Sequence, residues 1–204
     1  MTDAPLLLAL HSCSETFGVA VSDHQGRCDV ATFADGRGLS NTLITRVESV
    51  LPRERWRDLA GVAVATGPGG FTGTRLSVVL ARTLAQQLGC PLLGVSSYAL
   101  MAARLQPSLP AAQQALPFWI CRELPRRGTV AGQYQAADDG MVELQAPHLL
   151  PPEQHVAPAL DASDDVAPDV ERLLMLLQSM HAAGQPMPWQ GVLPLYPTSP
   201  VGPV

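Results

Sequence analysis

The order of apolar segments along this 204-residue chain predicts an α/β fold. Three short apolar runs separated by polar turns come first, and their spacing is typical of consecutive β-strands at residues 6–10, 17–21 and 28–33. Two stretches with helical periodicity then alternate with two more apolar runs. The resulting order, β-β-β-α-β-α-β, spans about one hundred residues. Because 47% of the residues are hydrophobic and 15% are charged, the chain has the composition of a globular protein rather than a disordered one.

The alternating part of this pattern predicts two helices and two strands, at residues 40–51 (helix), 61–65 (strand), 75–88 (helix) and 91–95 (strand). Pro52 and Gly89 follow the two helices and supply stop signals. Ser96 and Ser97 are candidate N-caps of a third helix that runs to about residue 105.

The pattern changes after residue 105, where a connector with several prolines leads into a second, smaller unit. Strand-like runs follow at residues 118–124, 129–135 and 141–145. The remaining segments predict, in order, a loop over 147–168, a helix over 170–183 and a proline-broken coil over 186–204.

The charged residues exclude several kinds of chemistry. All 13 basic residues are arginines, so the chain has no lysine for a Walker A loop or a Schiff base. The formal net charge of -5 disfavours nucleic-acid binding that depends on the overall charge of the chain. Arginine clusters at residues 53–57 and 126–127 are compatible with RNA or an acidic partner, but a solvated surface is the simpler interpretation.

The cysteines and histidines predict neither a disulfide framework nor a metal centre. The four cysteines lie far apart without a CxxC pair, which favours free thiols in a reducing cytosol. The five histidines show no HxxxH or HExxH spacing. His11 stands beside Ser12, Cys13 and Ser14, but neighbouring side chains at a strand end point to opposite faces, so we do not expect a catalytic dyad. The apolar run at residues 6–10 is too short for a signal sequence or a membrane span, so we expect a cytoplasmic protein.

The second predicted helix is apolar around well over half of its circumference. Arg82 and Gln86 form its main polar stripe. A surface helix needs only one apolar stripe to pack on its own sheet, so this helix must be buried on two sides. The second side is covered either by another part of this chain or by a partner protein, and the residues alone leave both alternatives open.

A glycine-rich segment, residues 67–74, connects a strand to this helix. Backbone N–H groups at such a place could cradle a phosphate at the helix N-terminus. The segment lacks the lysine of a Walker A loop and does not fit GxGxxG. The alternative is a tight turn whose glycines stand where a side chain would be blocked. The geometry expected from the sequence favours neither interpretation.

Three strings stand out among these motifs: LLALHS at residues 7–12, GPGGFTGTR at residues 67–75 and LGVSS at residues 93–97. Together they resemble the TsaB (YeaZ) family, bacterial partners in making threonylcarbamoyladenosine next to tRNA anticodons. The middle string is similar to that family's GPGSFTGLR signature, with Gly70 for serine and Thr74 for leucine. The resemblance covers residues 5–105 and is faint beyond them. It marks these signature residues: Gly67, Pro68, Gly69, Phe71, Thr72, Gly73 and Arg75.

The resemblance implies an actin/Hsp70/sugar-kinase-like fold made of two ribonuclease-H-like units, the second of them reduced. We therefore expect an N-terminal unit with partner-binding helices over residues 1–97. A shortened C-terminal unit with a proline-rich tail is expected over residues 98–204.

The resemblance also implies a role without catalysis, cofactor or metal. A TsaD-like chain transfers the threonylcarbamoyl group, and a TsaB-like chain dimerises with it through two N-terminal helices and activates it. A small TsaE-like ATPase joins the pair, tRNA is reached only through the complex, and the TsaB-like chain alone forms a homodimer. No membrane contact is implied. On this chain the interface residues expected from the resemblance and the apolar helix are Leu43, Val47, Val50, Leu76, Val79, Leu80, Thr83 and Leu84.

One departure from related proteins bears on catalysis. The first strand of such folds usually ends in an aspartate that helps ATPase relatives to position metal and water, and His11 stands in that place. A neutral imidazole does not hold hydrated magnesium as a carboxylate does. The alternative function, a small-molecule kinase or ATPase of the same fold, needs an acidic residue there and a second phosphate loop, and the sequence contains neither. Older descriptions of the family as peptidases need a metal-binding histidine pair, which the sequence also lacks.

Overall fold

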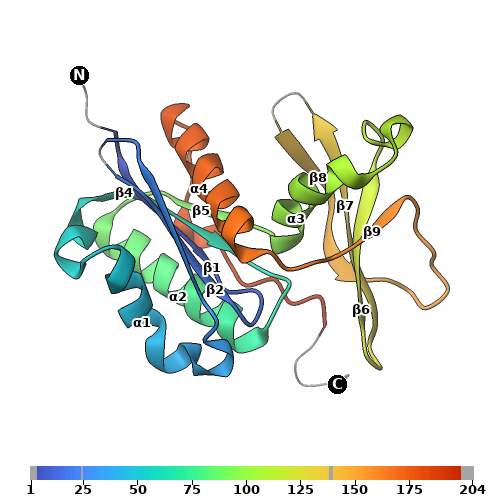
Figure 1. The fold of residues 1–204 in the computed structure, drawn as a ribbon, viewed down its shortest axis with the longest axis horizontal. Helices are drawn as coiled ribbons and strands as arrows, with labels where there is room; N and C mark the ends of the chain where they lie inside the picture. Colours follow the sequence, from blue (N-terminus) through green and yellow to red (C-terminus); the bar gives the residue numbers. More distant parts are fainter. Residues whose placement is uncertain (1–3, 24, 138–139, 199–204) are drawn as a thin grey trace.

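Two β-sheets organise this computed structural model, which describes residues 4–23, 25–137 and 140–198 (Figure 1). The first sheet has five strands in the spatial order β3-β2-β1-β4-β5. They are β1 (Leu6–His11), β2 (Phe17–Ser22), β3 (Cys28–Phe33), β4 (Leu59–Ala65) and β5 (Leu92–Val95). The first three strands pair antiparallel, whereas β4 is parallel to β1 and β5 is parallel to β4. All five strands expected in this unit are confirmed.

Helices cover both faces of the first sheet (Figure 1). α1 (Leu39–Val50) and α2 (Phe71–Leu88) pack on one face, and α4 (Val166–Ala182) packs on the other. Leu8 and Leu10 of β1 belong to the core on the α1/α2 side, whereas Leu7 belongs to the core beneath α4. Because β1 is buried on both sides, its residues form an unbroken apolar run. No helix in the described part of the chain is both long and apolar enough to span a bilayer.

The second sheet repeats the order of the first with one strand fewer, β8-β7-β6-β9. Its strands are β6 (Phe118–Leu124), β7 (Gly128–Ala137), β8 (Gly140–Leu149) and β9 (Ala159–Asp161). β6 takes the place of β1, because it pairs antiparallel with β7 and parallel with β9. α3 (Ser97–Leu105) covers one face, where Tyr98 and Met101 pack with Phe118 and Ile120. This arrangement matches the reduced second unit expected above.

Some element bounds differ from those expected. α2 begins at Phe71, one turn earlier than its periodicity indicates, because Thr72 and Gly73 are helical despite their low helix propensity. β9 and the first turn of α4, from Val166, lie within the segment 147–168 that was expected to be a loop. A three-residue strand carries too little alternation to be recognised.

The C-terminal part of the chain returns to the first unit. α4 packs against β1, β2 and β4, although it follows the second sheet in sequence. Residues 187–198, here called the C-terminal strap, then run beside β5 and α2. The main-chain N–H of Leu92 donates to the Met187 carbonyl at 2.9 Å, and that of Leu195 donates to the Thr66 carbonyl at 2.7 Å. The strap is therefore bonded to the first unit and is not a free coil, while the domain boundary at residue 97 stays a prediction.

Candidate functional site

The signature segment, residues 67–75, ties three parts of the protein together. The main-chain N–H of Gly70 donates to the Cys13 carbonyl in the β1–β2 turn at 3.1 Å. Ser97, at the start of α3, donates its main-chain N–H to the Gly67 carbonyl at 2.8 Å and its hydroxyl to the Pro68 carbonyl at 2.7 Å. The end of β4, the β1–β2 turn and the first turn of α3 are thus joined at this segment.

The signature glycines stand where backbones approach each other closely. A Cβ atom on Gly69 would lie 2.1 Å from the Cys13 carbonyl oxygen, and one on Gly73 would lie 2.7 Å from the Ser12 carbonyl oxygen. Both distances are far inside van der Waals contact, so no side chain fits. A Cβ on Gly70 would meet nothing within 4 Å, which explains why serine is also compatible with this position. These contacts favour the tight-turn interpretation of the glycines over the phosphate cradle.

The outer side of the signature segment presents an aromatic surface. Phe71 and Thr72 are exposed in the first turn of α2. The Phe71 ring packs on Tyr196 of the C-terminal strap with 4.8 Å between ring centroids. The Arg75 guanidinium lies 5.9 Å from the centroid of the same Phe71 ring. The strap and the signature helix therefore share one surface.

The polar residues at the end of β1 do not form a proton relay. The Ser12 hydroxyl donates to the Gly73 carbonyl at 2.8 Å and lies 2.6 Å from the Ser77 hydroxyl, whereas neither His11 ring nitrogen has a partner in the described residues. Burial lowers the pKa of His11 to about 4, so the imidazole is neutral at pH 7. Burial likewise raises the pKa of the Cys13 thiol to about 11, which keeps it protonated and unreactive. Within the described ranges no three His, Cys, Asp or Glu side chains are placed to hold a metal ion.

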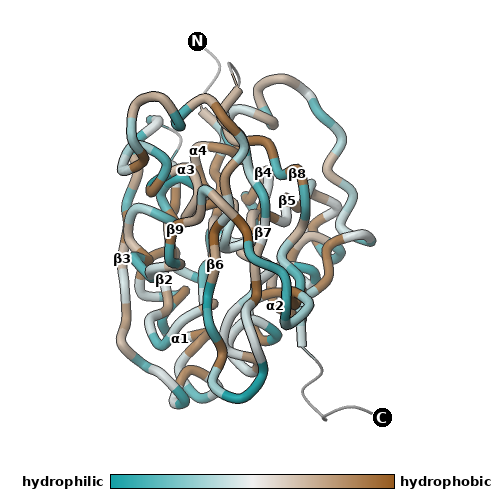
Figure 2. The backbone as a smooth tube through the Cα atoms, turned by 90° about the vertical axis from the view of Figure 1, so that its right-hand side faces the viewer, coloured by the Kyte–Doolittle hydropathy of each residue, from teal (hydrophilic) through white to brown (hydrophobic). Residues whose placement is uncertain are grey.

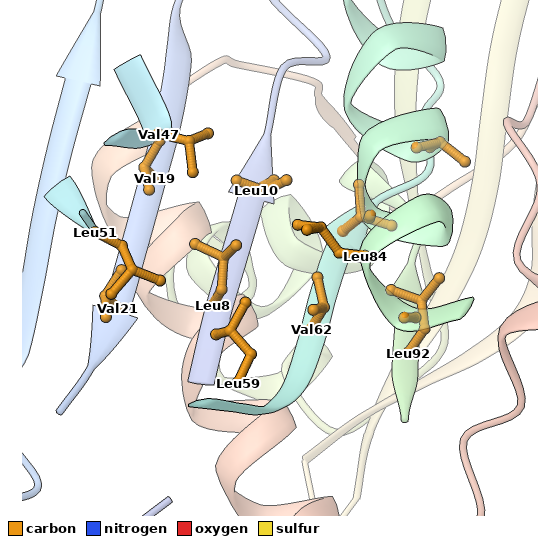
Figure 3. Packing of buried hydrophobic residues seen from close by; sticks show 14 of the residues in the cluster. Leu8, Leu10, Val19, Val21, Val47, Leu51, Leu59, Val62, Leu84 and Leu92 are labelled. Atoms are coloured by element: carbon orange, nitrogen blue, oxygen red, sulfur yellow. The ribbon is translucent and has the colours of Figure 1, made fainter. Parts of the chain in front are cut away.

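Three of the eight expected interface residues are core residues. Val47 of α1 is fully buried, and Leu43 and Leu84 are nearly so. Figure 3 shows Val47 and Leu84 among the buried side chains that pack around Leu8 and Leu10 of β1. These three side chains therefore pack into the core of the first unit, and their part in an interface stays a prediction. The sequence could not separate them from their neighbours, because α1 and α2 carry apolar residues on more than one face.

The other five expected residues remain accessible to different degrees. Val79 is 53% exposed and Thr83 is exposed, while Val50, Leu76 and Leu80 are half-buried against the core. Ile44 of α1, which was not among the expected interface residues, is 42% exposed. The sequence contains no signal that separates the exposed Ile44 from the buried Leu43, because both are apolar and belong to the same apolar part of the helix. We call the group of accessible side chains on the two packed helices the helix surface: Ile44, Leu76, Val79, Leu80 and Thr83.

The part of the helix surface that lies on α2 carries little charge. α2 contains no acidic residue, and its two arginines, Arg75 and Arg82, lie on the side toward the strap. Arg82 donates to the carbonyls of Trp189 and Gln190, each at 3.1 Å, and its guanidinium lies 5.3 Å from the Trp189 ring centroid. Arg82, one of the two residues of the polar stripe seen in the sequence, therefore makes a structural contact with the C-terminal strap.

Known proteins resemble this chain in sequence and in structure. Residues 39–121 match the family model of TsaD, tRNA N6-adenosine threonylcarbamoyltransferase. A 47-residue stretch, 23% of this chain, is 49% identical to the tRNA threonylcarbamoyladenosine biosynthesis protein TsaB of Bacillus subtilis (strain 168). That stretch spans only 20% of the length of the curated relative.

Two solved structures resemble the whole chain. One is a Pseudomonas aeruginosa protein described as uncharacterized and similar to peptidase YEAZ; it matches with a TM-score of 0.74 and 26% identity over 95% of this chain and 100% of its own. The other is YeaZ from Pseudomonas aeruginosa, with a TM-score of 0.73 and 26% identity over 94% of this chain and 99% of its own. The likeness extends over both units and confirms the actin-like fold class.

Proposed function

We propose that this chain, which is similar in sequence and structure to TsaB and YeaZ proteins, is a non-catalytic subunit of the complex that forms N6-threonylcarbamoyladenosine in tRNA. In this role it binds and activates a TsaD-like threonylcarbamoyltransferase. A TsaE-like ATPase joins the pair, tRNA is reached through the complex, and the chain alone forms a homodimer. The name of the curated relative supports the pathway, and the helix surface supports the mode of assembly.

The observation that carries this proposal is the helix surface. Val79 and Ile44 keep about half of their side-chain area in water, and Leu76 and Leu80 are half-buried on α2, which contains no acidic residue and packs against α1. Removing apolar area from water contributes about 25 cal/mol per Å². A second pair of amphipathic helices with the same character would bury these side chains in a four-helix contact.

A role without catalysis fits the groups at the end of β1. His11 stands where relatives with ATPase activity have a carboxylate, and it is neutral and enclosed. Cys13 is protonated and Ser12 is held by the Gly73 carbonyl, so neither is an activated nucleophile. The chain therefore supplies surface and positioning, and the transferase partner supplies the chemistry.

The test is light scattering after size-exclusion chromatography of this chain mixed with the TsaD-like protein of its own organism. We expect a one-to-one complex to replace the homodimer of the chain alone. Val79→Glu is expected to abolish both the homodimer and the complex while leaving the fold intact. Position 79 is about half exposed in the single chain, so a glutamate is tolerated there, but in the contact its carboxylate would be buried without a partner.

Met175→Glu is the matched control, because Met175 is 54% exposed on α4, on the opposite face of the first sheet. Circular dichroism checks that both variants fold. Separate, unchanged elution peaks of the two wild-type proteins, repeated with nucleotide and the TsaE-like ATPase, would contradict the proposal. ATP turnover by the chain alone in the presence of magnesium would contradict its non-catalytic character.

A further inference from the structure

A cavity of about 400 Å³ lies where the two units and the C-terminal strap meet. Its walls come from the β1–β2 turn, the signature segment, the hairpin between β6 and β7, and strap residues 195–198. Small-molecule sites in proteins have volumes of about 300–1,000 Å³ and are commonly found between domains. The helix surface is not part of this cavity, so the cavity is a separate feature of the molecule.

A hydroxyl group without a hydrogen-bond partner among the described residues lines the cavity. Tyr98, in the first turn of α3, is 1% exposed, and its hydroxyl has no hydrogen bond within the part of the chain that the structure describes. Burial raises the pKa of Tyr98 to about 12, so the group keeps its proton and is a hydrogen-bond donor. This hydroxyl is therefore available to donate a hydrogen bond to an oxygen of a bound molecule.

The charged groups of the cavity divide into a paired set and an unpaired set. Arg122 donates to the Asp164 carboxylate at 2.9 Å and to the Ala162 carbonyl at 3.2 Å, so this pair is neutral and structural. Glu15 and Arg127 also line the cavity, and neither carboxylate nor guanidinium has a partner among the described residues. One unpaired negative and one unpaired positive group suit a ligand that carries both charges better than a simple anion.

We propose that this cavity binds a small zwitterion with one carboxylate and one ammonium group, a free amino acid or a dipeptide. Arg127 would bind the carboxylate, Glu15 would bind the ammonium group, and the Tyr98 hydroxyl would donate to a ligand oxygen. Phe71 and Tyr196, which pack together at 4.8 Å between centroids, supply an apolar wall for a side chain. The hairpin between β6 and β7, where β6 changes from hydrophobic to hydrophilic in Figure 2, carries Arg127 to this place. This site is independent of the proposed partner surface.

The test is saturation-transfer NMR followed by calorimetry on the full wild-type chain, with single free amino acids and with dipeptides as separate probe sets. We expect at least one probe to bind, and the comparison of the two sets distinguishes the two sources of the same chemistry. Arg127→Gln is expected to weaken binding about tenfold or more, because a hydrogen bond between charged groups is lost. Arg126→Gln is the matched control, because Arg126 lies in the same hairpin but does not line the cavity, and we expect less than about twofold change.

Modified probes test the two ends of the ligand with wild type and with the variant at the matching end of the cavity. The carboxamide form of the bound probe is expected to bind wild type and Arg127→Gln equally weakly. The N-acetyl form is expected to bind wild type and Glu15→Gln equally weakly. The variant Tyr98→Phe tests whether the hydroxyl contributes to binding. No binding of any probe at about 10 mM, or binding that is unchanged in Arg127→Gln, overturns the proposal. Phosphate or ATP bound at Arg127 in place of every zwitterion also overturns it.

Discussion

Acidification will destabilise this protein through His11, a buried imidazole at the end of β1. The side chain is 1% exposed, and neither ring nitrogen has a partner in the described part of the chain. Loss of solvation lowers its pKa from 6.5 to about 4, and repulsion from Arg104 adds to this while attraction to Asp164 opposes it. The folded state therefore binds fewer protons than the unfolded state between these two pH values.

The sign and size of the effect follow from that difference. The contribution of His11 to the unfolding free energy is fully present above the unfolded pKa of 6.5 and is lost as the pH falls toward about 4. The reason is that only the unfolded chain takes up the proton on His11 in this range. The gap between the two pKa values corresponds to about 3 kcal/mol in total. Between pH 7.5 and pH 5 the expected loss is about 2 kcal/mol from His11 alone.

The assay is urea unfolding of wild type, His11→Leu and the control His155→Leu at several pH values from 7.5 to 5. His155 is exposed, so its replacement should leave the pH dependence of the unfolding free energy unchanged. His11→Leu should remove about 2 kcal/mol of that dependence, since leucine leaves no polar atom to protonate. Carboxylates contribute equally to all three proteins and cancel in the comparison. An equal pH dependence in wild type and His11→Leu would refute the reasoning.

Two further predictions concern packing. Gly69→Ala is expected to lower the unfolding free energy by about 2 kcal/mol or more, because the alanine Cβ would lie 2.1 Å from the Cys13 carbonyl oxygen. Gly70→Ser should change the unfolding free energy by less than about 0.5 kcal/mol, because a Cβ there meets nothing within 4 Å. Equal stabilities of the two variants in urea unfolding would contradict the close-approach account. Arg104→Ala is expected to lower the unfolding free energy by about 3 kcal/mol in the same assay. Arg104 donates to the Asp169 carboxylate at 2.9 Å, and Asp169 is 1% exposed, so the variant leaves an unpaired buried carboxylate. A cost under about 1 kcal/mol would show that this ion pair is dispensable.

Much of the first unit could be predicted from local sequence. The strands at residues 6–11 and 59–65 are apolar throughout because helices cover both faces of their sheet, and the antiparallel pairing of β2 with its neighbours follows from short polar turns. The signature string indicated the resemblance to the TsaB (YeaZ) family, and the structure explains why glycine is required at Gly69 and Gly73. Each of these features depends on residues close together in the chain or on a recognisable string.

The position of apolar side chains on the two helices could not be predicted. Leu43 and Ile44 are adjacent and equally apolar, yet one is in the core and the other is 42% exposed. Likewise Leu84 is buried whereas Val79 of the same helix is exposed. A helix with two apolar sides is compatible with either orientation, and only its contacts with the sheet and with the neighbouring helix select one.

The sequence by itself determined the elements of the first unit, the resemblance to the TsaB (YeaZ) family and the absence of lysine-dependent chemistry, because these depend on composition and on local pattern. The tertiary structure alone decided which side chains form the helix surface, that α4 and the C-terminal strap complete the first unit, and that Glu15, Tyr98 and Arg127 line one cavity. The physical reason is distance along the chain. Such contacts join residues far apart in the chain, for example Arg104 with Asp169 and Arg82 with the Trp189 carbonyl, and no local pattern records them.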